Sequence, residues 1–277
     1  MSDAAATNAG PVVLVDVADG VATITLNRPA ARNALNRATQ YALWDAVAAA
    51  GADPEVAVVI LTGADPAFCA GVDLKEVGGA MPPSVPSRDL SEPGPGRGTD
   101  GLYRFLPVID KPVIGAINGV AVTGGLEVAL QCTFLVASER ARFGDSHARV
   151  GILPGGGITV LLAQTVGLRK AIELSLTGNF LSAADALRLG LVNHVVPHED
   201  LLPFARQLAA DIAGNDQAAV RRLHQHYRRL ANAATLDEAH LLEGVMAETW
   251  PLDAGQVAAR RAAVTARGRA QAHEDRD

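Results

Sequence analysis

Cysteine, aromatic side chains and positive charge are all scarce in this sequence. It has two cysteines, 4% aromatic residues, and 24 lysines and arginines against 30 acidic side chains, which gives a net charge of −6. Because two cysteines cannot form a disulfide framework, we expect Cys69 and Cys132 to be free thiols packed as small hydrophobic side chains in a reducing cytosol. An acidic chain with few aromatic rings also lacks the basic surface and the stacking platforms that bind nucleic acid.

Long apolar runs are missing as well. The longest run, Val113–Val122, is interrupted by Asn118 and is shorter than the ~18 residues that a membrane span needs. The first ten residues have neither a basic nor an apolar segment, so the sequence predicts no signal peptide. We therefore expect a cytoplasmic protein with no membrane partner, in which residues 1–10 form a flexible arm.

Glycine is the residue that the chain has in excess. The sequence has 27 glycines among 277 residues, and they cluster. One cluster lies in residues 78–101, which also hold five of the 15 prolines. Such a long segment without regular structure is either a linker or an active-site cover. Because strand patterns resume on both sides of it, we expect a mobile cover.

The remaining chain alternates between strand and helix patterns. Alternating residues on either side of Asp19–Gly20 predict a β-hairpin. Further segments are assigned by apolar spacing and by Gly and Pro breaks: helices at 35–50, 124–131 and within 157–189, and strands at 57–61, 113–122, 134–137 and 191–196. Thr123 and Ser182 are expected to cap helices. The pattern predicts an α/β layered core over residues 11–200, followed by a helical region over residues 201–277.

Three segments that contain glycine could carry chemistry: FCAGVDLK (68–75), NGVAVTGGLEVAL (118–130) and FGDSHARVGILPGGG (143–157). In the second segment, Glu127 follows Gly124 by three residues. One helical turn would place its carboxylate on the same face as the free amide at the helix start. Such a pair can hold a carbonyl oxygen and move a proton beside it. On spacing alone, a carboxylate that only stabilises the first helical turn is the favoured interpretation.

Other chemistry finds little support in the sequence. It has no G-x-S-x-G motif, no phosphate-binding loop and no G-x-G-x-x-G motif after a strand. His224 and His226 are two residues apart on a predicted helix, so they point in different directions and cannot chelate one metal ion. We expect no metal site and no redox cofactor.

The three segments together resemble the crotonase superfamily, the enoyl-CoA hydratase/isomerase family. The resemblance extends to LNRPAARNAL and LTGNFLSAADALRLGLVNHVV and spans residues 12–200. It implies a spiral of ββα units with a C-terminal helical region that drives trimer formation, and trimers that often pair into hexamers. It also implies an acyl-CoA substrate, in which coenzyme A arrives as part of the substrate and no separate cofactor is needed.

The resemblance also assigns roles to individual residues. The backbone amides of Val72 and Gly124 would hold the thioester oxygen as it becomes an enolate, and Glu127 would activate water. The positions that line the substrate and coenzyme A pocket would be Arg32, Ala34, Ala70, Gly71, Asp73, Leu74, Lys75 and Thr123. Many relatives have a third glycine in place of Thr123, so its side chain would narrow the pocket or cap the helix.

One departure from the family pattern concerns His147. Hydratases of this family use two glutamates, and this sequence has His147 where the second one falls. His147 could replace that glutamate as an acid or base, since imidazole titrates near neutral pH. Alternatively, the protein could catalyse a different enolate-forming reaction, such as double-bond isomerisation, or could bind acyl-CoA without converting it. The leading hypothesis is an enoyl-CoA hydratase-like enzyme with Glu127 and His147 as its catalytic pair, and we expect a protonated His147 to lower the pKa of Glu127.

Overall fold

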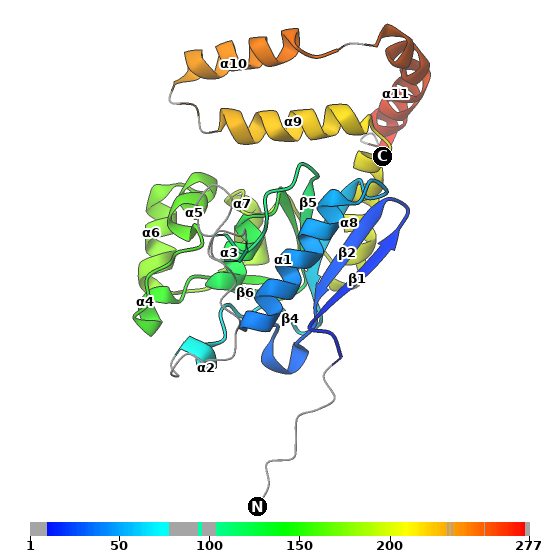
Figure 1. Cartoon of the computed structure of the whole chain (residues 1–277). Helices are drawn as coiled ribbons and strands as arrows, with labels where there is room; N and C mark the ends of the chain where they lie inside the picture. Colours follow the sequence, from blue (N-terminus) through cyan, green and yellow to red (C-terminus); the bar gives the residue numbers. More distant parts are fainter. Residues whose placement is uncertain are drawn as a thin grey trace, which may run out of the picture. The chain divides into compact units, whose positions relative to one another are not determined.

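A computed structural model describes residues 10–77, 94–95, 104–231, 233, 235–251 and 253–274. Nearly all of the expected N-terminal arm and most of the expected cover over residues 78–101 lie outside these ranges. The chain divides into two compact units, Met1–His224 and Gln225–Asp277. The predicted α/β core is confirmed in the first unit, where two sheets are combined with helices (Figure 1).

The larger sheet has six strands in the order β1-β2-β3-β5-β7-β10. In chain order, its strands are β1 (Val13–Ala18), β2 (Val21–Leu26), β3 (Val58–Gly63), β5 (Val113–Ile117), β7 (Phe134–Ser138) and β10 (His194–Val196). The first two strands pair in an antiparallel way and all other neighbours are parallel. Asp19 and Gly20 both have positive φ angles, 52° and 76°, as the tight turn of the predicted hairpin requires.

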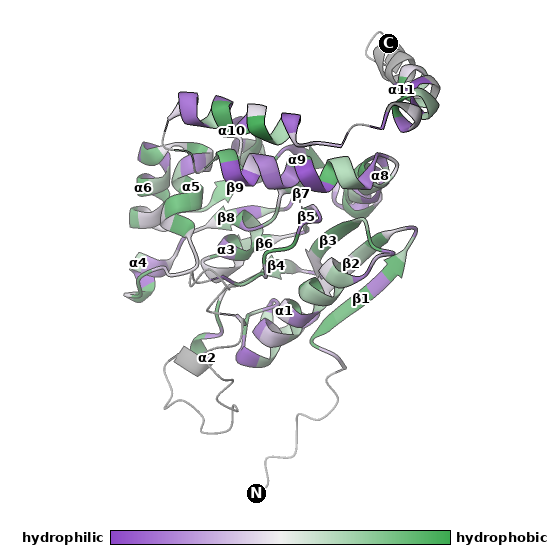
Figure 2. Ribbon diagram, turned by 45° about the horizontal axis from the view of Figure 1, so that its top comes forward, coloured by the Kyte–Doolittle hydropathy of each residue, from purple (hydrophilic) through white to green (hydrophobic). Residues whose placement is uncertain are grey.

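Strand β3, an inner strand of this sheet, is buried on both faces. All six of its residues are buried, and successive side chains point to opposite faces. Val59 and Leu61 join one hydrophobic cluster, while Val58 and Ile60 join the other. Helix α1 (Arg37–Ala52) packs in the first cluster and helix α8 (Leu201–Ala213) in the second. Figure 2 shows the contrast between the hydrophobic strand β3 and the mostly hydrophilic helix α9 (Gln217–Leu230).

A second, four-stranded sheet was not expected from the sequence. Its order is β4-β6-β8-β9, formed by β4 (Ala67–Cys69), β6 (Val120–Val122), β8 (Arg142–Gly144) and β9 (Leu181–Ser182). These strands have only two or three residues each, too few to show a recognisable alternation. Because β4, β6 and β8 are parallel, their carboxyl ends meet at one edge, and this edge positions the site described below.

The other helices of the first unit surround these sheets. They are α2 (Leu74–Val77), α3 (Gly124–Leu130), α4 (His147–Val150), α5 (Ile158–Val166), α6 (Leu168–Thr177) and α7 (Ala183–Arg188), with 3₁₀ turns at Pro29–Ala31 and His198–Asp200. Helix α9 extends past the boundary between the units, and the second unit contains α10 (Leu236–Glu248) and α11 (Ala254–Glu274). Within the residues that the structure describes, every helix is too short or too polar to span a lipid bilayer.

Two capping predictions had different outcomes. The Ser182 hydroxyl accepts a hydrogen bond from the Asp185 N–H and caps α7, as predicted. Thr123 precedes α3, but its side chain makes no capping hydrogen bond, so that part of the prediction is wrong. The backbone of Thr123 has φ 50° and ψ −116°, and its Oγ1 lies instead 3.4 Å from the Ser146 hydroxyl.

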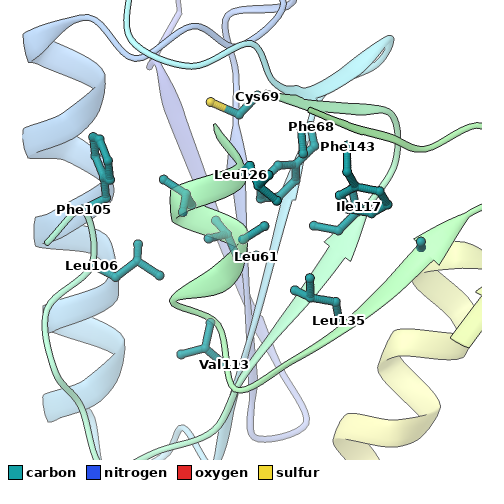
Figure 3. Packing of buried hydrophobic residues seen from close by; sticks show 14 of the residues in the cluster. Leu61, Phe68, Cys69, Phe105, Leu106, Val113, Ile117, Leu126, Leu135 and Phe143 are labelled. Atoms are coloured by element: carbon teal, nitrogen blue, oxygen red, sulfur yellow. The ribbon is translucent and has the colours of Figure 1, made fainter. Parts of the chain in front are cut away.

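Helix α3 is held in the centre of the first hydrophobic cluster. Leu126 of α3 lies among Phe68, Ile117 and Phe143 (Figure 3). The approach to the end of β4 is so close that a Cβ on Gly125 would lie 2.1 Å from the Cys69 carbonyl oxygen. Only glycine permits this approach, and it brings the start of α3 beside the segment that follows β4.

Candidate active site

A cavity of about 290 Å³ lies at the edge where β4, β6 and β8 end. Its walls come from all three segments that the sequence singles out. The first contributes Ala70, Val72 and Leu74, the second contributes Thr123, Gly124 and Glu127, and the third contributes His147 and several neighbours. The parallel pairing of the three strands explains this convergence, because loops that follow parallel strands lie side by side.

The Val72 amide is oriented by the segment near residue 35. Leu35 donates its N–H to the Gly71 carbonyl and accepts from the Asp73 N–H, at 2.8 and 3.1 Å. This parallel bridge provides hydrogen-bond partners for the Gly71 carbonyl and the Asp73 N–H, which lie on either side of Val72. Within the described ranges, the Val72 N–H has no acceptor from the protein, and Val72 itself lines the cavity.

The Gly124 amide is the second free donor. Gly124 is the first residue of α3, where backbone N–H groups have no partner inside the helix. No acceptor for its N–H is present in the described part of the chain. A Cβ on Gly124 would lie 3.2 Å from the Val72 nitrogen, and one on Gly71 would lie 3.3 Å from the Gly124 nitrogen. The two free amides are therefore near neighbours at one wall of the cavity.

Glu127 is a buried carboxylate one helical turn beyond Gly124. It is 2% exposed, and its Oε1 accepts from the Gly156 N–H at 2.8 Å and, in a longer contact, from the Ile158 N–H at 3.5 Å. Burial raises the pKa of Glu127, although the nearby His147 and the two N–H groups act to lower it. The interaction with His147 therefore lowers the pKa of Glu127, as expected from the sequence. Burial has the larger effect, and the net pKa of Glu127 is raised.

His147 lines the same cavity from the first position of α4. Its Nδ1 lies 2.6 Å from Oδ1 of Asp145, and its backbone N–H donates to the same oxygen at 3.1 Å. Asp145 is 1% exposed. Asp145 is not among the site residues expected from the sequence. The local signal was available, because an aspartate side chain often accepts the backbone N–H of the residue two positions later, which here is His147.

Five of the predicted pocket residues are not among those that line this cavity. They are Arg32, Ala34, Gly71, Asp73 and Lys75. The Arg32 carbonyl accepts from the Ala70 N–H, and Asp73 forms an ion pair with Arg28 at 3.2 Å. These contacts hold the segment that carries Val72.

Asn33 is a further residue that the sequence reasoning missed. It is fully buried with a φ of 57°. Its side chain donates to the carbonyls of Ala64 and Ala67 and accepts from the Arg28 N–H. Asparagine tolerates positive φ better than most residues, and here its hydrogen bonds hold the loop before β4 in place. A buried asparagine between two strand patterns gives no sequence signal that separates it from an ordinary turn residue.

The cavity combines two backbone donors, one desolvated carboxylate and one histidine. Two N–H groups aimed at one point stabilise an oxygen that gains negative charge, and the Glu127 and His147 side chains can transfer protons beside it. Among the described residues, no three side chains of His, Cys, Asp or Glu lie together in a way that could hold a metal ion. The arrangement fits acid–base chemistry next to a carbonyl group.

Comparisons with known proteins agree with this geometry. Residues 16–255 match the family model described as enoyl-CoA hydratase/isomerase. The chain is 43% identical over 204 residues to a probable peroxisomal enoyl-CoA hydratase 1 of Arabidopsis thaliana, covering 74% of this chain and 73% of the relative.

Solved structures give the same result. A crystal structure of an enoyl-CoA hydratase from Mycobacterium tuberculosis H37Rv superposes with a TM-score of 0.71 at 48% identity, covering 86% of this chain and 98% of the other. A monofunctional enoyl-CoA isomerase from M. smegmatis superposes with a TM-score of 0.67 at 30% identity, covering 83% and 99%. The family match and these relatives extend over most of the chain, and the chain belongs to the enoyl-CoA hydratase/isomerase family.

Proposed function

We propose that this protein is an enoyl-CoA hydratase-like enzyme that adds water to the double bond of a 2-enoyl-CoA thioester. Its relatives include a probable enoyl-CoA hydratase from a plant and a crotonyl-CoA hydratase from a bacterium. The observation that carries the proposal is the pair of free amides, Val72 and Gly124, beside the buried Glu127 in one cavity.

In the proposed reaction, the thioester oxygen accepts hydrogen bonds from the Val72 and Gly124 N–H groups. Ionised Glu127 takes a proton from water, and the resulting hydroxide forms a bond to the β-carbon. The electron pair of the double bond moves to the α-carbon and carbonyl as an enolate, which the two amides stabilise. Protonated His147 then gives its proton to the α-carbon, and the proton held by Glu127 returns to His147 through solvent. Coenzyme A takes part only as a portion of the substrate.

The test is an assay of crotonyl-CoA and longer 2-enoyl-CoA thioesters, followed by the loss of absorbance of the conjugated thioester. Wild type, Glu127→Gln and His147→Ala are compared, with binding of the saturated acyl-CoA measured in parallel. General acid–base groups contribute about 10²- to 10⁴-fold, so we expect each substitution to lower kcat by at least ~100-fold with acyl-CoA binding retained. Tight acyl-CoA binding without turnover at any chain length would instead identify a binding protein.

A second candidate is double-bond isomerisation of an enoyl-CoA. In the part of the chain that the structure describes, Glu127 is the one carboxylate that lines the cavity, together with His147. Moving a proton between two carbons needs one group that both accepts and donates it. A structural relative titled a monofunctional enoyl-CoA isomerase supports this second candidate. Incubation with a 3-enoyl-CoA separates the two candidates, because only isomerisation produces the conjugated thioester from it.

Assembly as a homotrimer or a pair of trimers is also part of the proposal. Helix α6 exposes large apolar side chains, with Leu168, Ile172 and Leu176 exposed by 65%, 47% and 73%. Exposed apolar groups on one helix are typical of a surface that another subunit covers. Light scattering after size-exclusion chromatography measures the mass of the assembly directly, and a monomer would contradict this part. The cytoplasmic location stays a prediction of the sequence.

A further inference from the structure

The structure holds a second buried carboxylate, Asp145, which directly precedes the cavity-lining residues Ser146 and His147 and which the proposed reaction leaves unused. Asp145 directly follows β8 and is 1% exposed. Its Oδ1 accepts two hydrogen bonds from the same residue: the backbone N–H of His147 at 3.1 Å and the ring Nδ1 at 2.6 Å. The first contact fixes the start of α4, and the second fixes the plane of the imidazole ring.

These contacts determine which ring nitrogen is free. A carboxylate only accepts hydrogen bonds, so Nδ1 must carry a proton toward Asp145. The neutral ring then has its lone pair on Nε2, and the charged ring has its transferable proton there. The Nε2 atom has no protein partner in the part of the chain that the structure describes, and His147 lines the cavity with Glu127.

The charges around His147 also favour this arrangement. From α3, Glu127 faces the same cavity. On α4 itself, Arg149 is directed away, since its guanidinium donates to the Thr177 carbonyl and to the Asn179 side chain. The polar neighbours of the cavity wall, Thr123 and Ser146, carry no charge. Asp145 is therefore the buried group that compensates a positive charge on His147, and this leaves Glu127 free to act as the base.

We propose that Asp145 is a positioning residue that holds His147 as the Nδ1-protonated tautomer, so that Nε2 delivers the proton to the α-carbon of the bound thioester. This inference rests on the proposed function for its kinetic part, whereas the tautomer itself can be measured without any substrate. Where the family pattern has a second glutamate, two side chains of this chain act together. His147 carries the proton, and the buried Asp145 carries the negative charge and fixes the orientation of the His147 ring.

The kinetic test is a double-mutant cycle of Asp145→Asn and His147→Gln. In the wild-type background we expect Asp145→Asn to lower kcat by about 10- to 100-fold, with KM changed by less than about threefold. In the His147→Gln background, Asp145→Asn should change kcat by less than about threefold, because the imidazole ring that Asp145 orients is absent. Equal losses in both backgrounds, or a loss confined to KM, would overturn the proposal.

The matched control is Asp53→Asn. The Asp53 Oδ1 accepts the N–H of Glu55 at 2.9 Å, the same local contact that Asp145 makes with His147, but Asp53 lies at the end of α1 outside the cavity. We expect this variant to retain the wild-type kcat and KM. A loss in kcat equal to that of Asp145→Asn would show that replacing the carboxylate of any such turn is enough, and would overturn the positioning role.

The spectroscopic test uses ¹⁵N-histidine labelling and nuclear magnetic resonance of the full chain, with the His147 signals assigned by their loss in His147→Gln. In the wild type we expect a protonated Nδ1 and an unprotonated Nε2 in the neutral ring. A neutral ring protonated at Nε2 would overturn the proposal, even if Asp145→Asn failed to fold. If the expected tautomer is found but no enoyl-CoA is hydrated, the positioning stands and the proposed reaction fails.

Discussion

Gly71 offers the sharpest test of the paired amides. Its φ is +90°, and a Cβ there would lie 2.8 Å from both the Thr123 Oγ1 and the Val122 carbonyl oxygen, and 3.3 Å from the Gly124 nitrogen. A Gly71→Ala substitution would therefore push a methyl group against the backbone that presents the second amide. Val72, which presents the first amide, is the next residue in the chain.

The expected loss has two parts that a control variant separates. The positive φ alone costs an alanine about 1–2 kcal/mol, and overpacking against backbone atoms adds about 1–3 kcal/mol. The matched control is Gly190→Ala, whose φ is +76° and whose Cβ would meet nothing within 4 Å. It carries the conformational cost without the contact, and should lower the midpoint of thermal unfolding by roughly 2–8 °C at about 2–4 °C per kcal/mol.

Activity distinguishes the two variants more clearly than stability does. Displacing a catalytic group by about 1 Å can cost ~100-fold in rate, and loss of one oxyanion donor costs about 10²–10³-fold. We expect Gly71→Ala to lower kcat for crotonyl-CoA hydration by at least ~100-fold, while Gly190→Ala keeps the wild-type kcat. A folded Gly71→Ala variant with normal kcat would refute the assignment of Val72 and Gly124 as the oxygen-binding amides.

Three further predictions concern buried polar groups. Burial raises the pKa of Glu127 above 4.5, so the contribution of Glu127 to stability is greatest at low pH and is lost as pH rises through the raised pKa. The unfolding midpoint of Glu127→Gln should therefore rise relative to that of the wild type as pH increases from 4 to 8. A difference that falls over this range would contradict the prediction. Asn33→Ala leaves three backbone groups at a buried site without partners and should cost about 3 kcal/mol or more of unfolding free energy, so an unchanged unfolding midpoint would be inconsistent with these contacts. Cys69 is fully buried, and burial raises its pKa to about 12. This thiol should react with a disulfide reagent only after unfolding in urea, and rapid reaction of Cys69 in the folded protein would show that it is accessible.

The regular elements with strong patterns were predictable from the sequence. The hairpin at Asp19–Gly20, the buried strands near residues 58 and 113 and the helix that starts at Gly124 all lie where apolar spacing and glycine placed them. These signals are local, because a tight turn, a two-sided buried strand and a helix start each need particular residues within a few positions. The second sheet left no such signal, because its strands of two or three residues depend on neighbours distant in the sequence.

The site divides in the same way. The sequence alone indicated which segments line the cavity, the family to which the chain belongs, and the departure at His147. Only the tertiary structure decided that the Val72 and Gly124 amides find no acceptor among the described residues, that burial outweighs His147 in shifting the pKa of Glu127, and that Asp145 fixes the ring of His147. The physical reason is that a hydrogen bond left unmade, a desolvated charge and an oriented ring all depend on atoms that only the folded chain brings together.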